Sequence, residues 1–588
     1  MACLTTLLLL AHGVYAAAVF GRQEKAASSS CKAIPGDSTW PSQQAWTELN
    51  QTIGGRLIET IPQAAVCHPG GYAGLSQNET ACASLKQEWD YPKALKKTHS
   101  LSKASEIMNP FFQNTSCSPY YRTDQPCALG NLVSYAVAVA SPADIVAAIN
   151  FTQTHNIRLV IKNTGHDWLG KSTGTGALSL WTHNLQAKQI LNYTSAHYTG
   201  PAIKVGAGVT GGDALTHASK YGYRIVSGDC PTVGYAGGYS SGGGHSILNS
   251  VHGLAADNIL EWEVVTADGR HLIASPEQNS DLYWAMSGGG AGTFAVAISM
   301  TARVHPDGII GAASLSFNAT SAPSNASFVT ALNAWWKFLP SLVDVGATPS
   351  WNVYPGHFRV PNTTAPGRTA ADMDTLYSPY LSELKRLNIP YTYNSYSAPN
   401  YFQHYNDTDG PLPYGPYQVS EIFNSRLVPR NISEDASELT ATMLSAITLD
   451  SAANWQFGCL GINVNSSSIS NAVTPHWRSA LAICLEFSLY NWTVPEEVMV
   501  KRRMDLAGVI HPAIEKVTVG GGAYLNEADP LVYPEGDSTK WQEAFYGSTY
   551  ERLREVKRTW DPRGAFYSYT AVGSEDWVKD GVGRLCRV

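Results

Sequence analysis

Short apolar runs alternate with amphipathic stretches between residues 126 and 305. Residues 133–140 are rich in β-forming side chains. Ser141 followed by Pro142 is typical of a helix start, with serine at the N-cap and proline in the first turn. The apolar positions of that helix suit one buried face, and residues 157–161 form the next apolar run. This alternation predicts a domain of mixed sheet and helix.

The same alternation continues to residue 300. It predicts strands at 203–205, 224–226 and 294–300, a helix at 213–221, and a hairpin of 259–266 with 271–274 around the turn Asp268-Gly269.

The pattern of apolar and polar positions changes near residue 305. Residues 306–515 hold longer helical stretches, at 328–338 and 370–387, and a tyrosine-dense segment from 391 to 417. We interpret this region as a substrate domain, an antiparallel sheet covered by helices. The tyrosines would either shape an aromatic pocket or, as is more common, pack within the sheet. Residues 21–125 are irregular and are expected to form a cysteine-containing N-terminal cap.

Composition narrows the class of protein. The 588 residues allow two or three domains, and the formal net charge of -7 comes without a basic patch, which argues against a nucleic-acid partner. Residues 1–20 resemble a secretory signal peptide, with an apolar centre at 7–10 and small residues at 16–18. No other stretch approaches the roughly 20 apolar residues of a bilayer span, so no membrane association is expected.

Glycosylation sequons support export to the secretory path. Twelve are present, at Asn50, Asn78, Asn114, Asn150, Asn192, Asn318, Asn325, Asn362, Asn406, Asn431, Asn465 and Asn491. We therefore expect a secreted, N-glycosylated protein.

The cysteines fit an oxidising compartment. If Cys3 leaves with the signal and Cys230 is reserved, eight of the ten remain, enough for four disulfides. Connectivity does not follow from sequence, although Cys117 with Cys127, which bracket a short loop, is the pair we expect. No Cys-x-x-Cys and no clustered His/Cys spacing occurs, so no metal site is expected.

Two loops carry the candidate chemistry. Residues 228–246 hold Cys230 followed by six glycines, with no charge after Asp229. Glycine loses much backbone entropy on folding, so such density indicates that the backbone must come very close to another group, such as a strand or a flat ligand. The second loop, residues 163–170, follows an apolar strand and carries His166 at its tip.

Together these loops resemble the FAD-binding domain of the vanillyl-alcohol oxidase / p-cresol methylhydroxylase superfamily, in its berberine bridge enzyme-like branch. The resemblance implies that His166 bonds to the flavin 8-methyl carbon and that Cys230, in Cys-Pro-Thr-Val-Gly, bonds to flavin C6. It therefore implies a bicovalently held FAD. The other residues it assigns to cofactor binding are Thr164, Gly165, Asp167, Trp168, Val233, Gly234, Gly237, Gly238, Ser241 and Gly242.

The Cys230 loop departs from the common family pattern. Tyr235 and Ala236 separate Gly234 from the next glycine, where many relatives have one residue, and Tyr239 stands where many have histidine. The loop is closer to isoamyl alcohol oxidase-like relatives.

The C-terminal residues 516–588 resemble the module named after the berberine bridge enzyme. Tyr524 and Asn526 match its Tyr-x-Asn motif, and residues 550–560 read as a helix ended by Asp561-Pro562. The resemblance places Tyr524 near the substrate face of the flavin, where it would accept or relay a hydroxyl proton if its pKa is lowered. It also implies that this module folds back onto the FAD domain. The fold class is therefore α+β: a two-part FAD-binding domain (126–305, with the returning module) and a substrate domain.

Three rival interpretations stay open at this stage. Residues 206–211 fit the G-x-G-x-x-G dinucleotide pattern after a strand and before a helix, which would suit NAD. Residues 238–242 match the G-x-S-x-G hydrolase motif around Ser240, although the glycines that follow are a poor helix start. A secreted flavin- or carbohydrate-binding protein without turnover is the third.

The sequence as a whole favours a secreted FAD-dependent oxidase. It would remove a hydride from an alcohol, a sugar or a secondary metabolite, with coupled cyclisation as an option, and reduce oxygen to hydrogen peroxide. A dehydrogenase that uses another acceptor is the alternative. The expected partners are a small-molecule substrate and oxygen, and a monomer is expected.

Overall fold

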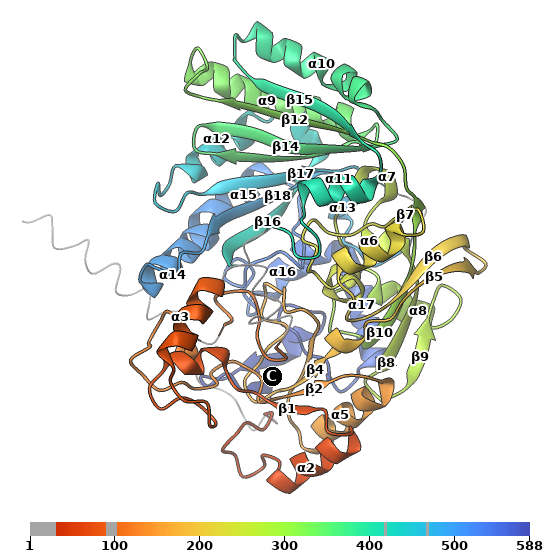
Figure 1. The fold of residues 1–588 in the computed structure, drawn as a ribbon, viewed down its shortest axis with the longest axis vertical. Coiled ribbons are helices and arrows are strands. Elements are labelled where there is room, and N and C mark those ends of the chain that lie inside the picture. The colour runs from red at the N-terminus through yellow and green to blue at the C-terminus, as the bar shows by residue number, and fades with distance from the viewer. Residues whose placement is uncertain (1–30, 90–102, 114, 417–419, 466–469) are drawn as a thin grey trace, which may run out of the picture.

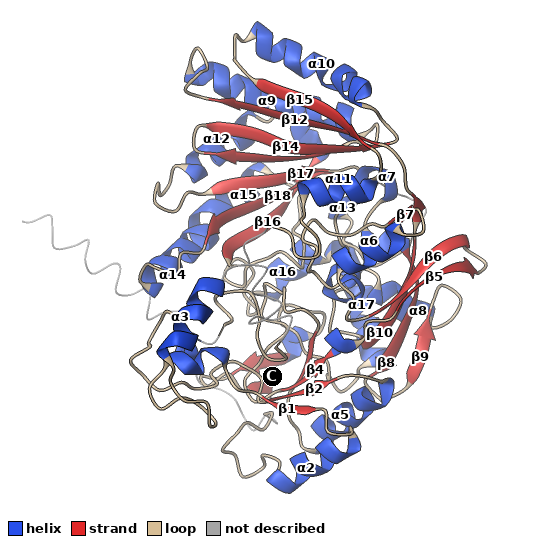
Figure 2. Cartoon of the chain, viewed as in Figure 1, coloured by secondary structure: helices blue, strands red, loops and turns tan. Residues whose placement is uncertain are grey.

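The computed structural model describes residues 31–89, 103–113, 115–416, 420–465 and 470–588. The expected signal peptide and the sequon at Asn114 lie outside these residues. Three sheets dominate the fold, and the largest occupies the upper half of the molecule in Figure 1, above the two smaller sheets. Figure 2 shows helices along the outside of all three.

The first sheet has four strands in the order β1-β2-β4-β3. Strands β2 (Tyr135–Ala138) and β3 (Leu159–Lys162) both run parallel to β4 (Leu178–Trp181), and β1 (Leu57–Glu59) pairs antiparallel with β2. Helix α5 (Pro142–Thr154) joins β2 to β3 and begins after a capping box between Ser141 and Asp144, as the sequence predicts. Helix α2 (Gln43–Thr52) packs on α5. The loop that carries His166 thus begins at the carboxyl end of a parallel strand, where ligands commonly bind.

The second sheet is antiparallel, in the order β5-β6-β10-β8-β9. Its strands are β5 (Lys188–Thr194), β6 (Thr199–Gly206), β8 (Ile259–Thr266), β9 (His271–Ala274) and β10 (Ala295–Arg303). The predicted hairpin of β8 with β9 is confirmed. Helices α7 (Asn249–His252) and α8 (Ser280–Met286) lie between its strands in sequence.

Two predicted elements differ in their bounds. Helix α6 (Gly211–Ser219) begins before the predicted start because the Thr210 hydroxyl caps it, accepting from the Asp213 N–H at 3.3 Å. The strand predicted at 224–226 is mostly wrong. Strand β7 (Tyr223–Arg224) has two residues and pairs antiparallel with β11 (His305–Pro306), an equally short strand just after the end of β10, so the length of its partner limits its own.

The third sheet has seven antiparallel strands, in the order β15-β12-β14-β13-β17-β18-β16. They are β12 (Ile310–Asn318), β13 (Thr348–Tyr354), β14 (His357–Pro366), β15 (Thr392–Ala398), β16 (Glu421–Pro429), β17 (Gln456–Gly461) and β18 (Ala480–Leu489). The helices of this region are α9 (Asn325–Val343), α10 (Ala370–Arg386), α11 (Tyr401–Thr408), α12 (Ser437–Ile447), α13 (His476–Ser479), α14 (Glu496–Asp505) and α15 (His511–Val517). Helices α9, α10 and α12 pack directly on its strands, so the predicted helix-covered antiparallel sheet is confirmed.

The C-terminal module returns to the first half of the chain. It contains α16 (Ser538–Phe545), α17 (Tyr550–Trp560), β19 (Trp577–Lys579) and β20 (Leu585–Arg587). Helix α17 ends before Asp561, as predicted, and buried Lys557 donates from Nζ to the Thr293 carbonyl at 2.6 Å and to Asp561 at 2.7 Å. These bonds fix the module against the glycine-rich turn that precedes β10.

Four disulfides staple the described chain: Cys31–Cys586, Cys67–Cys82, Cys117–Cys127 and Cys459–Cys484. The expected pairing of Cys117 with Cys127 is confirmed. The first bridge ties the two ends of the described chain together, and the next two hold the N-terminal cap around α3 (Glu79–Glu88). No helix in the described ranges is both long and apolar enough to cross a membrane.

Candidate active site

A cavity of about 370 Å³ lies where the His166 loop, the Cys230 loop, the seven-stranded sheet and the C-terminal module meet. This volume is within the usual range of small-molecule sites. The predicted residues that line it are Thr164, Gly165, His166, Asp167, Trp168, Cys230, Val233, Gly234, Gly237, Gly238, Ser241, Tyr524 and Asn526. Strand β16 contributes Glu421 and Phe423, and Leu485 comes from β18.

Gly242 is the one predicted residue that does not line the cavity. A Cβ atom built there would lie 2.3 Å from the amide nitrogen of Asn526. A side chain at this position would therefore displace Asn526, and glycine is needed for contact with the C-terminal module.

His166 and Cys230 meet at one hydroxyl group. Thr232 Oγ1 lies 2.8 Å from His166 Nε2 and 3.4 Å from Cys230 Sγ. Thr232 itself is buried, with 1% of its surface exposed. Two side chains 64 positions apart are thus held at one place on the cavity wall.

The thiol of Cys230 is free. It is the only cysteine among the described residues outside a disulfide. Burial raises its pKa to about 11, against the lowering effect of its hydrogen bonds to Thr232, and the charges of Asp229 and Glu421 raise it further. At neutral pH the group is a protonated thiol.

Asp167 and Trp168 shape the His166 loop. The carboxylate of Asp167 accepts from the backbone N–H groups of Lys171 (2.5 Å) and Ser172 (3.0 Å), which closes the turn after His166. The Trp168 ring stands edge-on against Phe423 of β16, with ring centroids 3.9 Å apart. The loop is therefore fixed both by its own turn and by the seven-stranded sheet.

The glycines of the Cys230 loop mainly serve packing of protein on protein. Cβ atoms at Gly234 and Gly237 would approach the side-chain nitrogen of Asn163 to 2.2 and 2.8 Å. At Gly238 the nearest atom is the Ala291 Cβ, 3.9 Å away. Of these three glycines, only Gly238 leaves the backbone open on the side of the absent Cβ.

The part of this loop that holds the extra residue forms a π-helical turn, Tyr235–Tyr239. Such turns absorb extra residues and occur often at functional sites. Tyr239, which replaces the family's histidine, is buried and donates its hydroxyl to the His245 carbonyl at 2.8 Å. It thereby supports the glycine-rich end of the loop.

Tyr524 and Asn526 form a compact pair at the cavity wall. The Tyr524 hydroxyl oxygen accepts from the Asn526 amide at 2.7 Å and from the Gly244 N–H at 3.2 Å. Asn526 also donates to the Gly238 carbonyl at 2.8 Å. Burial, together with the nearby Glu527 charge, raises the pKa of Tyr524. The condition of a lowered pKa, on which proton removal by Tyr524 depended, is therefore not met, and Tyr524 is a phenol at neutral pH whose oxygen accepts from two N–H groups.

Sequence reasoning missed three further residues of the site. Asp229, His245 and Glu527 all line the cavity, and His245 Nε2 lies 2.9 Å from Glu527 Oε1. His245 ends the glycine run and Glu527 directly follows Tyr-x-Asn, so each is adjacent to a motif. Their contact, across 282 positions, is not encoded in any local pattern.

The dinucleotide interpretation of residues 206–211 is wrong. Strand β6, which supplies Gly206, pairs antiparallel with both its neighbours, whereas the NAD motif requires a parallel βαβ unit. Cβ atoms at Gly206 and Gly208 would strike the carbonyls of Leu185 and His183, at 2.2 and 2.0 Å. These glycines permit the loop before β5 to cross the end of β6.

The hydrolase interpretation is also wrong. Ser240 is fully buried and donates to the Tyr235 carbonyl at 2.6 Å. A nucleophile elbow instead presents an exposed hydroxyl at the start of a helix.

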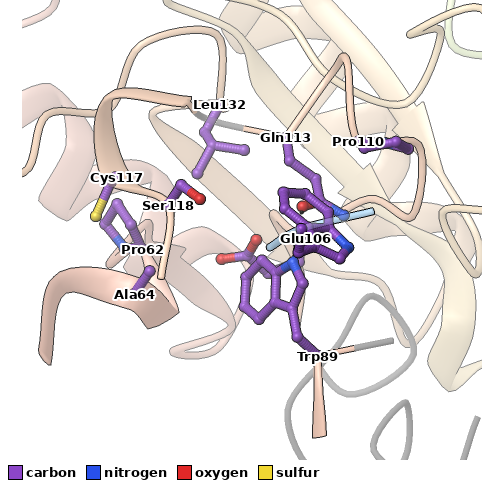
Figure 3. A pocket seen from close by; sticks show the side chains of 10 residues that line it. Pro62, Ala64, Trp89, Glu106, Pro110, Gln113, Cys117, Ser118 and Leu132 are labelled. Atoms are coloured by element: carbon purple, nitrogen blue, oxygen red, sulfur yellow. Dashed lines mark hydrogen bonds between the residues drawn. The ribbon is translucent and has the colours of Figure 1, made fainter. Parts of the chain in front are cut away.

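A second, very small cavity lies in the N-terminal cap, beside Trp89, Glu106 and Gln113 (Figure 3). Its volume of about 10 Å³ has room for roughly one water molecule. Burial raises the pKa of Glu106. This cavity is too small for a cofactor or substrate.

The lining of the large cavity fits a flavin. It offers an imidazole and a free thiol that contact the same hydroxyl group, together with aromatic and aliphatic groups from β16 and β18. Asn163, which also lines it, keeps a buried side-chain oxygen without a hydrogen-bond partner in the described residues. Within the same residues, no group of three or more histidine, cysteine or acidic side chains is arranged to hold a metal ion.

Comparison with known proteins agrees with this geometry. Residues 133–275 match the family model of the FAD binding domain, and residues 523–573 match that described as berberine and berberine like. The FAD-linked oxidoreductase orf1 of Neocamarosporium betae is 68% identical over 99% of both chains.

Two further relatives extend the comparison. The bifunctional decalin synthase calF of Penicillium decumbens is 44% identical, covering 95% of this chain and 96% of its own. The crystal structure of the VAO-type flavoprotein MtVAO615 from Myceliophthora thermophila superposes with a TM-score of 0.89 at 44% identity, over 95% of this chain and all of that one. The chain therefore belongs to the berberine bridge enzyme-like FAD-linked oxidoreductases of the vanillyl-alcohol oxidase family.

Proposed function

We propose that this protein is an oxidase whose FAD is bound covalently through both His166 and Cys230. The observation that supports this most directly is the shared contact of these two side chains with the Thr232 hydroxyl. When bound, FAD supplies the acceptor for a hydride and the site at which oxygen is reduced to hydrogen peroxide. Two covalent links would hold the ring and make it a stronger oxidant.

The chain's own residues would bind and orient the substrate beside the C-terminal module. Tyr524, held by Asn526 and the Gly244 N–H, would present its hydroxyl proton to a substrate oxygen. Because the pKa of Tyr524 is raised, its hydroxyl group donates a hydrogen bond or relays a proton more readily than it removes a proton from the substrate.

The substrate would be an alcohol, a sugar or a secondary metabolite. Oxidation coupled to ring closure is a second candidate, because a relative 44% identical over nearly the whole chain is named a bifunctional decalin synthase. In that case the oxidised product would cyclise inside the same cavity. A dehydrogenase with another acceptor is distinguished from the oxidase by the absence of peroxide.

We further propose that the protein is secreted, N-glycosylated and monomeric. Four disulfides support an oxidising compartment. Asn362 would be an exception among the sequons, because its buried amide donates to Thr364 at 3.0 Å and lies 3.1 Å from His404.

The test uses holoprotein from a secretory host. Primary alcohols, sugars and polyene alcohols are added without oxygen while the flavin absorbance is followed, and air is then admitted to measure peroxide. Bleaching followed by one peroxide per flavin supports the oxidase. Bleaching without peroxide would make the protein a dehydrogenase, and protein without flavin would remove the proposal.

A further inference from the structure

Three ionisable side chains that line the cavity lie close together near Tyr524. Asp229 precedes Cys230, His245 ends the glycine run, and Glu527 follows Asn526 in the C-terminal module. The cluster therefore brings together the Cys230 loop and the returning module, two parts of the chain that meet only in the folded protein.

The position of His245 is closely defined. Its Nε2 atom lies 2.9 Å from Glu527 Oε1, and its ring stacks near Trp477, with centroids 6.3 Å apart. Tyr524 stands edge-on to the same ring at 5.4 Å. Only 14% of the His245 side chain and 21% of the Glu527 side chain is exposed. Such contacts hold the imidazole in one orientation and leave one carboxylate oxygen of Glu527 outside the pair.

Each of the three side chains keeps an unused polar atom. Asp229 Oδ1, His245 Nδ1 and Glu527 Oε2 are buried and have no hydrogen-bond partner in the described part of the chain. Leaving a buried polar group unpaired costs about 1–3 kcal/mol, and such groups are commonly satisfied by a bound molecule. Three of them around one cavity indicate a polar ligand group between them.

The two carboxyl groups of the cluster favour the protonated form of His245. Burial alone lowers the pKa of His245, but the charge and hydrogen bond of Glu527, with the charge of Asp229, raise it to about 9. At neutral pH the imidazole is therefore cationic. Burial and the Glu527 charge raise the pKa of Asp229, against the effect of His245.

The geometry points to a subsite, formed by Glu527, His245 and Asp229, that accepts a hydrogen bond from a hydroxyl group of a neutral substrate and then takes its proton. The inference rests on the proposed oxidase function and names the substrate class more closely. Tyr524 would be the donor to the same hydroxyl oxygen, and Glu527 the acceptor of its proton.

The proton and electron balance follows from an alcohol substrate. The O–H bond breaks with its proton going to Glu527, the C–H bond breaks with its electron pair going to the flavin of the proposed function, and the C=O bond forms. The four acidic residues that line the cavity are Asp167, Asp229, Glu421 and Glu527, against Lys171 and the His245 cation. A substrate carboxylate at this subsite would meet one unpaired donor, His245 Nδ1, against two unpaired carboxylate oxygens, Glu527 Oε2 and Asp229 Oδ1, in a cavity with more acidic than basic side chains. Alcohols are therefore expected to bind better than acids of the same shape.

The test measures binding, with a probe that cannot be oxidised. 2-Phenyl-2-propanol carries a hydroxyl but no hydrogen on the same carbon, and benzoate is a carboxylate of similar shape. Affinities of both for the holoprotein are measured by calorimetry. Wild-type protein should prefer the alcohol at least tenfold. Glu527→Gln should weaken alcohol binding about tenfold to a hundredfold, as expected for loss of a charged hydrogen-bond acceptor.

Glu263→Gln is the matched control, since it removes a carboxylate that is likewise paired with a histidine, His271 at 2.9 Å, but does not line the cavity. It should change alcohol binding less than threefold. Equal affinity for the two probes, including no measurable binding of either, would overturn the subsite, and so would equal effects of the two variants.

A second readout needs neither ligand nor flavin. Hydrogen–deuterium exchange at histidine C2, followed by mass spectrometry of peptides, reports the pKa of His245. It should fall from about 9 toward its ordinary value in Glu527→Gln and stay near 9 in Glu263→Gln. An unchanged value in Glu527→Gln would refute the coupling. Flavin on the purified protein is scored separately, so failure of the subsite and failure of the oxidase proposal remain distinguishable.

Discussion

The Thr232 hydroxyl offers a sharp test of how the chain prepares its two attachment residues. Thr232→Val removes the oxygen that lies 2.8 Å from His166 Nε2 and 3.4 Å from Cys230 Sγ, with little change of shape. One neutral hydrogen bond is worth about 1 kcal/mol, and the longer contact to sulfur adds less. We therefore expect the arrangement in which His166 and Cys230 both face Thr232 to be destabilised by about 1–2 kcal/mol, which lowers its population roughly 5- to 30-fold.

The assay follows flavin attachment in time. Protein produced in a riboflavin-depleted host is mixed with FAD, and the peptides that contain His166 and Cys230 are weighed at intervals. The initial attachment rate of Thr232→Val should fall 5- to 30-fold, while Thr232→Ser, which keeps the hydroxyl, should stay within about threefold of wild type. Attachment at the wild-type rate in Thr232→Val would show that the shared hydrogen bond does not prepare the site.

Three further predictions concern stability and turnover. His252 and His305 stack at 3.7 Å, and burial lowers their pKa values to about 3 and about 4, so the apparent unfolding temperature should fall as the pH drops below 6.5. As the pH falls, the unfolded chain protonates these histidines before the folded chain does, so the free energy of unfolding decreases by up to roughly 1.4 kcal/mol per pH unit for each histidine. The decrease in unfolding temperature should be shallower in a His252→Asn/His305→Gln variant. Replacing Cys31 and Cys586 by serine should lower the free energy of unfolding by about 2–5 kcal/mol, which is measured as a lower unfolding temperature. An unchanged unfolding temperature would show that this disulfide does not stabilise the fold. Tyr524→Phe should keep its flavin but lose about a hundredfold in the anaerobic reduction rate with any substrate found, and an unchanged rate would remove Tyr524 from the mechanism.

The sequence predicts the elements around the site well where a local signal exists. The start of α5 follows from its capping residues, the hairpin of β8 with β9 from its Asp-Gly turn, and the end of α17 from Asp561-Pro562. The strand predicted at 224–226 is shorter than expected because its extent depends on β11, a two-residue strand in a distant segment, which no local pattern reports.

The candidate site divides in the same way. His166 and Cys230 stand in loops with recognisable spacing, but Thr232 joins them only in three dimensions. The pairing of His245 with Glu527 depends on how the C-terminal module docks, and the raised pKa of Tyr524 depends on burial. The density of glycine predicts close approach of a strand or a flat ligand, whereas Gly234 and Gly237 make room for the side chain of Asn163.

The most direct test of the account is the mass of two peptides. The protein is secreted from a host that supplies FAD, denatured in acid, digested, and searched for flavin on the His166 and Cys230 peptides. The account predicts FAD joined to both, so that the two peptides travel as one cross-linked species. Colourless protein with both peptides unmodified would contradict it.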